Sequence, residues 1–281
     1  MRESLESSGR GRAWATPLAL GLMPAVAGAF ALLAPHVQLS DGWLDFVTFF
    51  APTAAAFAGL TIGSLAVPSR QVVLGVLGVA AASLAAIAFA GAYSMVLALV
   101  VGACLVAIGW GIGLPIGRRV QHPGHLLPAC ALAAGVDIAS VFSESGPTAA
   151  IVESKRALAV LALPFPVLGT DDVVPTLGAG DLVFVGVLLG VAAKHGISRF
   201  RTYVAAMVGV LLAGLASALL EAAVPALPAI GLAALVGIPQ ARAVPPRDRK
   251  VATVAVVAAA TLALATALSR LVANDGSIGN H

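Results

Sequence analysis

The stretch that decides the fold runs from Val173 to Ala193 and reads VVPTLGAGDLVFVGVLLGVAA. It is about twenty residues of nearly unbroken apolar sequence, which is long enough to cross a bilayer as a helix. Its one ionisable side chain is Asp181, directly after Gly178-Ala179-Gly180. Because an acid in hydrocarbon costs at least about 2.5 kcal/mol, an aspartate at this position indicates a functional role.

The composition of the whole chain is that of a polytopic membrane protein. Of its 281 residues, 59% are hydrophobic and 10% are charged, with a mean hydropathy of +0.99, whereas a soluble domain carries about 25% charged residues. The net charge of +3 comes from short basic clusters between apolar spans, so it does not indicate nucleic-acid binding. Cys104 and Cys130 both fall inside apolar spans, and we interpret them as small buried residues.

The hydropathy pattern predicts an all-α transmembrane bundle of about nine spans. Between the fifth and sixth spans lies a 12-residue apolar piece, Ala157–Leu168, which is too short to cross and contains Pro164 and Pro166. We expect this piece to be interfacial or re-entrant. We expect the chain to divide into three regions: a four-span region (1–122), a catalytic region (123–241) and an extra C-terminal span with its tail (242–281). The predicted spans are 15–35, 43–66, 71–91, 93–117, 126–143, 173–193, 202–221, 224–240 and 251–273.

The basic residues set the expected orientation, because loops on the cytoplasmic side are enriched in lysine and arginine. With the N-terminus inside, all of the sixteen basic residues except Lys155, Arg156 and Arg270 fall in inner segments. This pattern predicts a multi-pass protein of the cell membrane with a cytoplasmic N-terminus and an outer C-terminus. The first span follows three arginines and contains Ala27-Gly28-Ala29, so a cleaved signal peptide is an alternative for that span.

A second acid, Asp137, lies comparably deep in its own span. It is about seven residues before the outer end of one span, and Asp181 is about eight after the outer start of the next. At 1.5 Å per residue, both carboxyl groups are expected about 10–12 Å below the outer helix ends. Two nearby carboxylates share a proton, so one can activate water while the other protonates a carbonyl, as in aspartic proteases. From this chemistry alone, a protease, a proton relay in a transporter or channel, and a structural role all stay open.

Three motifs follow one another in the chain. They are Val136-Asp137-Ile138-Ala139-Ser140-Val141-Phe142, followed by Gly146-Pro147 and Val152-Glu153; then Leu177-Gly178-Ala179-Gly180-Asp181-Leu182-Val183-Phe184; and then Pro225-Ala226-Leu227-Pro228. In this order they resemble the presenilin and signal peptide peptidase family of intramembrane aspartyl proteases of the GxGD type. The resemblance covers about residues 126–240.

This resemblance implies an intramembrane aspartic endopeptidase with Asp137 and Asp181 as its catalytic pair and without a metal or another cofactor. It implies substrates that are single-pass membrane proteins or signal-peptide remnants within the lipid bilayer. The residues expected to bind the substrate are Gly178, Ala179, Gly180, Pro225, Ala226 and Leu227. The loop between the aspartates is expected outside, which is similar to the orientation of signal peptide peptidases.

The chain also departs from the family pattern. Val136 stands where the family usually has tyrosine, four spans instead of five precede the first aspartate span, and the span 251–273 follows the Pro-Ala-Leu span. The long cleavable loop of presenilins is absent, so autoproteolysis is not expected.

Two other functions remain as alternatives. A proton-coupled transporter would use the same buried acids, but the two related halves that many transporters show are not visible in the sequence. A prepilin-peptidase-like protease would also use a GxGD aspartate, but Leu182-Val183 follows Asp181 here where that group typically has Val-Lys. His122 and His125 have an i, i+3 spacing but no acid near them in the sequence, so we expect a solvated turn instead of a metal site.

Overall fold

The computed structural model describes residues 14–33, 36–37, 40–90, 94–143, 154–168, 170 and 172–278. The structure is mostly helical (82%) and divides into two compact units. Unit 1 comprises Met1–Arg119 and Lys155–Tyr203, and unit 2 comprises Val120–Ser154 and Val204–His281. This grouping differs from the predicted division into regions, because residues 155–203 of the predicted catalytic region (123–241) belong to unit 1 and the rest of that region belongs to unit 2.

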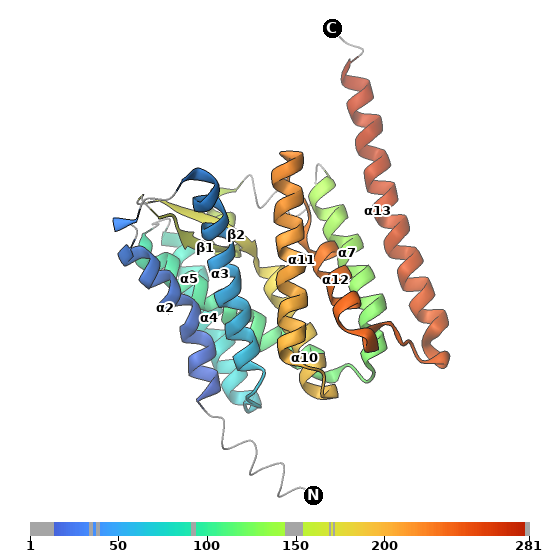
Figure 1. The fold of residues 1–281 in the computed structure, drawn as a ribbon, viewed down its shortest axis with the longest axis horizontal. Coiled ribbons are helices and arrows are strands. Elements are labelled where there is room, and N and C mark those ends of the chain that lie inside the picture. The colour runs from blue at the N-terminus through green and yellow to red at the C-terminus, as the bar shows by residue number, and fades with distance from the viewer. Residues whose placement is uncertain are drawn as a thin grey trace, which may run out of the picture. The chain divides into compact units, whose positions relative to one another are not determined.

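Unit 1 is a helical bundle with a small sheet. In chain order, it contains α2 (Ala15–Leu33), α3 (Asp41–Gly63), α4 (Arg70–Ala90), α5 (Met95–Ile108), a π-helical turn (Gly109–Gly113), α6 (Leu114–Arg119), α9 (Lys155–Leu161), β1 (Ala162–Pro166), β2 (Val173–Gly178), α10 (Ala179–His195) and the start of α11 (Arg199–Leu220). The strands lie near one end of α2 and α3 (Figure 1).

Unit 2 begins with a 3-10 turn (Pro123–His125) and α7 (Leu126–Phe142). The rest of α11, α12 (Ala226–Gly237), two further 3-10 turns (Pro239–Arg242 and Pro246–Asp248) and α13 (Arg249–Ile278) complete it. α7 packs against both α12 and α13.

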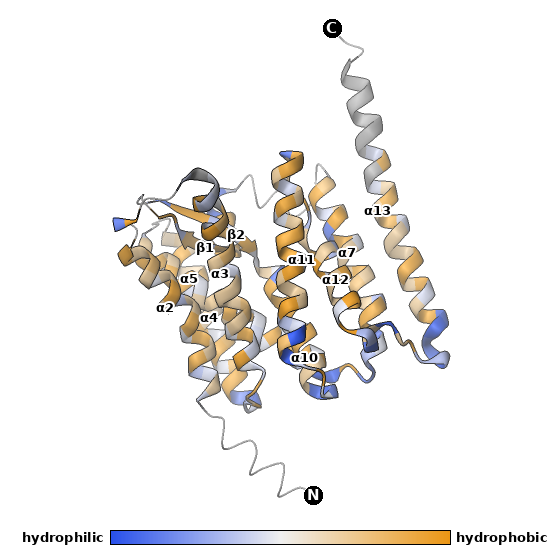
Figure 2. Ribbon diagram, in the orientation of Figure 1, coloured by the Kyte–Doolittle hydropathy of each residue, from blue (hydrophilic) through white to orange (hydrophobic). Residues whose placement is uncertain are grey.

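Seven helices in the described part of the chain are long and apolar enough to cross a membrane. They are Ala15–Leu33, Gly42–Gly63, Arg70–Ala90, Met95–Arg119, Pro123–Phe142, Arg199–Leu220 and Pro246–Thr266. Figure 2 shows these helices as largely hydrophobic along their length, with hydrophilic residues gathered near their ends. This is consistent with the predicted multi-pass helical membrane protein, while the nine spans and the orientation of the termini stay predictions.

The deciding stretch 173–193 is not one continuous helix, so that prediction is wrong. Residues 173–178 form β2, and the helix that follows, α10, has 17 residues. The physical reason is local: Pro175 lacks the N–H that a helix needs, and Gly178 is a poor helix former. α12 is also shorter than its predicted span, with 12 residues.

The apolar piece Ala157–Leu168 contains the end of α9 and strand β1 of an antiparallel hairpin, which the all-α prediction did not include, and its interfacial or re-entrant position stays a prediction. β1 pairs with β2 from Ala162 opposite Gly178 to Pro166 opposite Val173, with an irregularity between Ala162 and Pro164. Leu163 and Phe165 of β1 are fully buried, and the Thr176 hydroxyl donates a hydrogen bond of 2.9 Å to the Leu163 carbonyl. The hairpin therefore anchors the chain directly before α10.

Glycines allow α10 to pack closely against the segment from Gly109 to Arg119. A Cβ added at Gly113 would lie 2.9 Å from the Cα of Gly186, and a Cβ added at Gly117 would lie 2.9 Å from the Cα of Gly190. Real Cβ atoms do not approach other atoms this closely, so the backbones touch only because both sides are glycine. Small residues at four-residue spacing are a recurrent solution for helix contacts in membranes.

α7 and α13 run parallel. His125, just before α7, contacts Asp248, just before α13, and Gly135 of α7 lies against Ala259 of α13. Two parallel membrane-spanning helices require an odd number of crossings between them. The condition is met if α11 alone crosses between them, and also if α10, α11 and α12 all cross. The second case corresponds to the predicted order, in which three spans lie between 126–143 and 251–273.

Candidate functional site

Asp137 lies on α7 and is half-buried. Its Oδ2 accepts a hydrogen bond of 3.0 Å from the backbone N–H of Leu227, which is 90 residues away in the sequence. Leu227 is the second residue of α12, so its N–H is one of the helix donors that have no partner within the helix. The carboxylate of Asp137 therefore caps α12, and the first and third sequence motifs meet at this bond.

The start of α12 is regular despite its two prolines. Pro225 is the buried residue before the helix, with an extended conformation (φ −61°, ψ 132°), and Pro228 is the third residue within it. The first residues of a helix need no intrahelical N–H partner, so a proline there removes nothing. Because Pro225 and Pro228 have no N–H, Ala226 and Leu227 carry the two backbone donors of this motif, and the N–H of Leu227 is given to Asp137.

α13 supports α7 from a different side. Gly135 lies against Ala259, and a Cβ at Gly135 would come within 2.8 Å of the Ala259 carbonyl oxygen. Gly135 and Asp137 are two residues apart, which is about 200° around the helix axis. α13 therefore packs on the face of α7 opposite to Asp137 and leaves the Asp137 face to α12.

Asp181 occupies the third position of α10, in the first helical turn. Its Oδ2 accepts a hydrogen bond of 3.1 Å from the backbone N–H of Gly178, the residue before the helix. An acid reaching back in this way stabilises the helix start, and the positive end of the helix dipole favours an acidic residue there. The GxGD motif is thus a strand-to-helix junction that holds its own aspartate.

The depth predicted for Asp181 assumed a helix over the residues before it. Those residues are mostly strand, and a strand rises about 3.3 Å per residue, or about 20 Å over six residues. The matched depth of Asp137 and Asp181, which rests on equal residue counts, therefore does not follow from the sequence.

Ala179 and Gly180 form the first turn of α10 beside Asp181. Gly180 is exposed, and a Cβ added to it would meet no atom within 4 Å among the described residues. Its lack of a side chain is therefore not explained by close packing of the chain against itself. Among the described residues, nothing therefore crowds position 180, next to the aspartate.

The two aspartates belong to different units, Asp137 to unit 2 and Asp181 to unit 1. The structure brings Asp137 together with Pro225, Ala226 and Leu227, and it brings Asp181 together with Gly178, Ala179 and Gly180. The direct pairing of the two carboxyl groups stays a prediction. Gly146-Pro147 and Val152-Glu153, which follow the first motif, lie outside the described residues.

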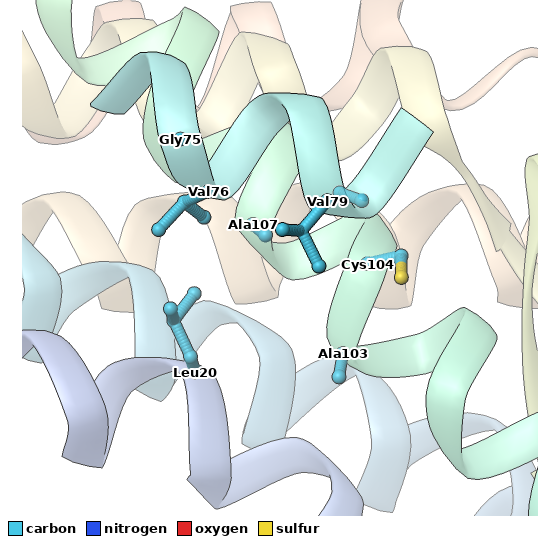
Figure 3. A pocket seen from close by; sticks show the side chains of 8 residues that line it. Leu20, Gly75, Val76, Val79, Ala103, Cys104 and Ala107 are labelled. Carbon is cyan, nitrogen blue, oxygen red and sulfur yellow. The ribbon is translucent and has the colours of Figure 1, made fainter. Parts of the chain in front are cut away.

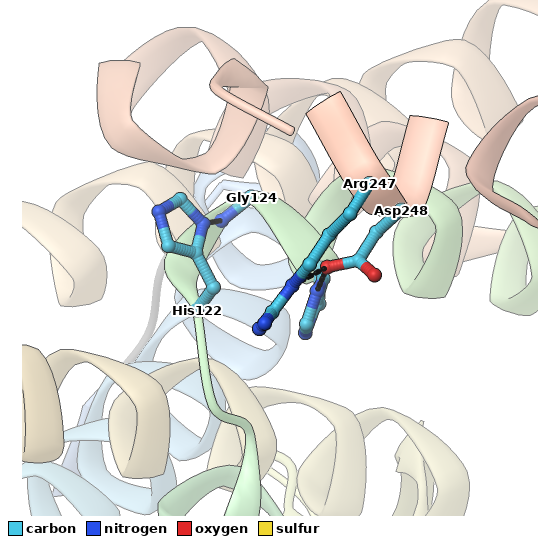
Figure 4. Close-up of polar contacts among 5 residues, drawn as sticks. His122, Gly124, Arg247 and Asp248 are labelled. Carbon is cyan, nitrogen blue, oxygen red and sulfur yellow. Dashed lines mark hydrogen bonds and ion pairs between the residues drawn. The ribbon is translucent and has the colours of Figure 1, made fainter. Parts of the chain in front are cut away.

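His125 has an acidic partner that was not expected. Its Nε2 lies 3.0 Å from Oδ2 of Asp248, and the Nε of Arg247 lies 3.4 Å from the same oxygen (Figure 4). The Nδ1 of His122 accepts a hydrogen bond of 3.0 Å from the Gly124 N–H. The contact with Asp248 joins positions 123 residues apart, which local sequence could not reveal. Within the described ranges, no group of three or more His, Cys, Asp or Glu side chains is placed to hold a metal.

A cavity of about 330 Å³ in unit 1 lies away from this chemistry. Its lining is apolar and comes from α2, α4 and α5 (Figure 3), with Leu20, Gly75, Val76, Val79, Ala103 and Cys104 among the residues. Such a lining has no acid or base that could act in hydrolysis, so this cavity is not the candidate site.

The glycines at 109, 113 and 117 are the positioning residues that the sequence interpretation missed. They hold α10, which carries Asp181, against the end of the fourth candidate span. Their spacing of four residues, repeated by Gly186 and Gly190, is a visible signal. By itself it indicates only the glycine enrichment that is ordinary in packed membrane helices, because the sequence does not show which glycine pairs with which.

No model of a known protein family matches the chain, and no curated protein matches it. The likeness of the three motifs to the presenilin and signal peptide peptidase family therefore stays a prediction from the sequence.

Proposed function

We propose that this protein is an intramembrane aspartic endopeptidase with Asp137 and Asp181 as its catalytic pair. The observation that carries the proposal is the hydrogen bond from the Leu227 N–H to Asp137. It joins an aspartate on a candidate membrane span to the start of the Pro225-Ala226-Leu227 helix, and these are two of the three motifs on which the family resemblance rests.

In this mechanism, the two carboxyl groups share one proton. The ionised carboxylate takes a proton from water as the water oxygen attacks the carbonyl carbon of the scissile peptide bond, and the protonated acid donates its proton to the carbonyl oxygen. Proton transfer to the amide nitrogen then breaks the C–N bond and gives a new carboxyl and a new amine terminus. The backbone N–H groups of Leu227 and Gly178 each keep one carboxylate oxygen oriented.

The strand β2 supports a role in receiving substrate. In the described residues the sheet has two strands, so β2 pairs with β1 along one edge only. β2 leads directly into the turn that carries Gly180 and Asp181. A peptide bond inside a helix is closed to attack, and we propose that an unwound transmembrane segment adds to the second edge of β2 and reaches Asp181 over Gly180.

The decisive experiment measures cleavage of single-span peptides in liposomes by the parent protein and by Asp137→Ala and Asp181→Ala. Asp172→Asn is the matched control, because Asp172 is exposed and is the nearest described acid before Asp181. Cleavage that is lost in both alanine variants, kept in the control and blocked by an aspartic-protease transition-state analogue supports the proposal. Turnover retained in either alanine variant contradicts it, and proton flux that depends on the aspartates would favour the transporter.

A further inference from the structure

The segment between α12 and α13 is a folded element and not a loose linker. It forms two 3-10 turns, Pro239–Arg242 and Pro246–Asp248, and Ala241 of the first turn is fully buried. A Cβ at Gly124 would lie 2.6 Å from the carbonyl carbon of Ala243 and 2.8 Å from the Val244 nitrogen. The segment is therefore seated closely against the turn that opens α7.

The only acid of this segment is already engaged. Asp248 contacts His125 at 3.0 Å and Arg247 at 3.4 Å through the same oxygen (Figure 4). The contact with His125 pins the start of α13 to the start of α7. The carboxylate of Asp248 is thus shared between His125 and Arg247.

The other charged residues of the segment are basic and exposed, and one of them, Arg247, also contacts Asp248. Arg242, Arg247, Arg249 and Lys250 are all exposed, and the Arg247 side chain is 76% exposed. Figure 2 shows this hydrophilic group at the start of α13, next to the hydrophobic length of the helix. We refer to residues 239–250 as the basic turn.

The basic turn lies where two candidate membrane spans begin. The spans Pro123–Phe142 and Pro246–Thr266 start side by side and run parallel, so their common end marks a membrane–water boundary. At a membrane–water boundary, the negatively charged groups that can pair with these basic side chains are the phosphates of the lipid headgroups. Guanidinium groups bind phosphate oxygens through paired N–H donors, and basic clusters beside a transmembrane helix attract anionic lipids.

We propose that the basic turn is a binding site for the phosphate headgroups of anionic phospholipids. The turn carries four exposed basic residues, Arg242, Arg247, Arg249 and Lys250, against one acid, Asp248, whose carboxylate contacts His125 and Arg247. The site is independent of peptide hydrolysis, so it stands whether or not the chain is a protease.

The experiment uses the purified full chain in a neutral detergent, titrated with phosphatidylglycerol or phosphatidylcholine, and counts bound lipids by native mass spectrometry. The test variant is Arg249→Gln/Lys250→Gln. Its matched control is Lys155→Gln/Arg156→Gln, because both are adjacent exposed basic pairs at the start of a helix. Because the measurement is made in detergent, a change in the orientation of the protein in a bilayer cannot account for a difference between the variants.

We expect the parent to retain phosphatidylglycerol in preference to phosphatidylcholine. The test variant should bind phosphatidylglycerol about tenfold more weakly, and the matched control should bind it like the parent. Arg247→Gln should weaken binding in the same direction, which provides a second variant if the double substitution alters folding. Inorganic phosphate at millimolar concentration should not displace the lipid.

Equal retention of the two lipids by the parent would overturn the proposal. An equal loss of phosphatidylglycerol binding in the test variant and in the matched control would also overturn it, because the effect would then be one of net charge. Displacement by inorganic phosphate would show an anion site without a preference for the lipid surface, and this too would contradict it.

Discussion

The backbone N–H of Leu227 and the carboxylate of Asp137 are joined by a hydrogen bond of 3.0 Å across 90 residues of sequence. The donor is a main-chain group at the start of α12, so its position depends on the helix and not on a side-chain rotamer. A carboxylate oriented by a helix start is held rigidly, which is what a catalytic acid requires.

Removing the Leu227 donor tests this relationship. Leu227→Pro abolishes the N–H at a helix position where proline is tolerated, whereas Leu227→Ala keeps the N–H and removes the side chain. Hydrogen bonds to charged groups contribute about 1.5–3 kcal/mol, so cleavage by the proline variant should fall about tenfold or more below that of the alanine variant. Peptide cleavage rates in liposomes, with thermal melting as a check of folding, measure the difference. Equal rates in the two variants would show that the bond does not position Asp137.

Exchanging each aspartate for asparagine separates chemistry from structure. The side-chain amide has nearly the shape of the carboxyl group it replaces, and its oxygen still accepts the hydrogen bond from Leu227 or Gly178. We therefore expect Asp137→Asn and Asp181→Asn to melt within a few degrees of the parent and to lose cleavage by at least about a thousandfold. Melting curves and peptide cleavage rates measure the two effects separately. A large loss of thermal stability in either variant would indicate that the aspartate serves folding.

The glycine contact behind α10 predicts a loss of stability. Gly113→Ala would place a Cβ 2.9 Å from the Cα of Gly186 and 3.0 Å from the Val187 nitrogen, so α10 must shift. Overpacking of this kind costs about 1–3 kcal/mol, and the apparent melting temperature should fall by several degrees. The control is Gly78→Ala, since a Cβ at Gly78 meets no described atom within 4 Å. Matching melting curves for the two variants would contradict the close packing of α10.

Gly180 predicts the opposite combination, a loss of activity without a loss of stability. A side chain at position 180 has open space around its Cβ, so Gly180→Leu should fold like the parent. If the substrate passes over this turn, the leucine blocks it, and cleavage should fall at least about tenfold, mainly through a higher KM. Gly21→Leu is the control, because Gly21 on α2 is equally open and belongs to no candidate motif. Unchanged cleavage by Gly180→Leu would place the substrate path elsewhere.

The sequence by itself determined the class of the molecule and most of its helices. Long apolar runs identify candidate membrane spans because burial in hydrocarbon requires an unbroken apolar surface, and seven of the nine predicted spans correspond to such helices. The break predicted between the spans 71–91 and 93–117 is also present, since α4 ends at Ala90, α5 begins at Met95 and the two helices pack against each other. The candidate aspartates could be named because an acid in an apolar run is costly wherever the run folds.

Only the tertiary structure decided which segments meet. Hydropathy does not separate a buried strand from a buried helix, so the hairpin of β1 and β2 was missed although Pro175 signalled it. The contacts of Asp137 with Leu227 and of His125 with Asp248 join residues 90 and 123 positions apart. Neither contact leaves a local pattern, because a hydrogen bond between distant segments depends on how the helices pack and not on the residues beside each partner.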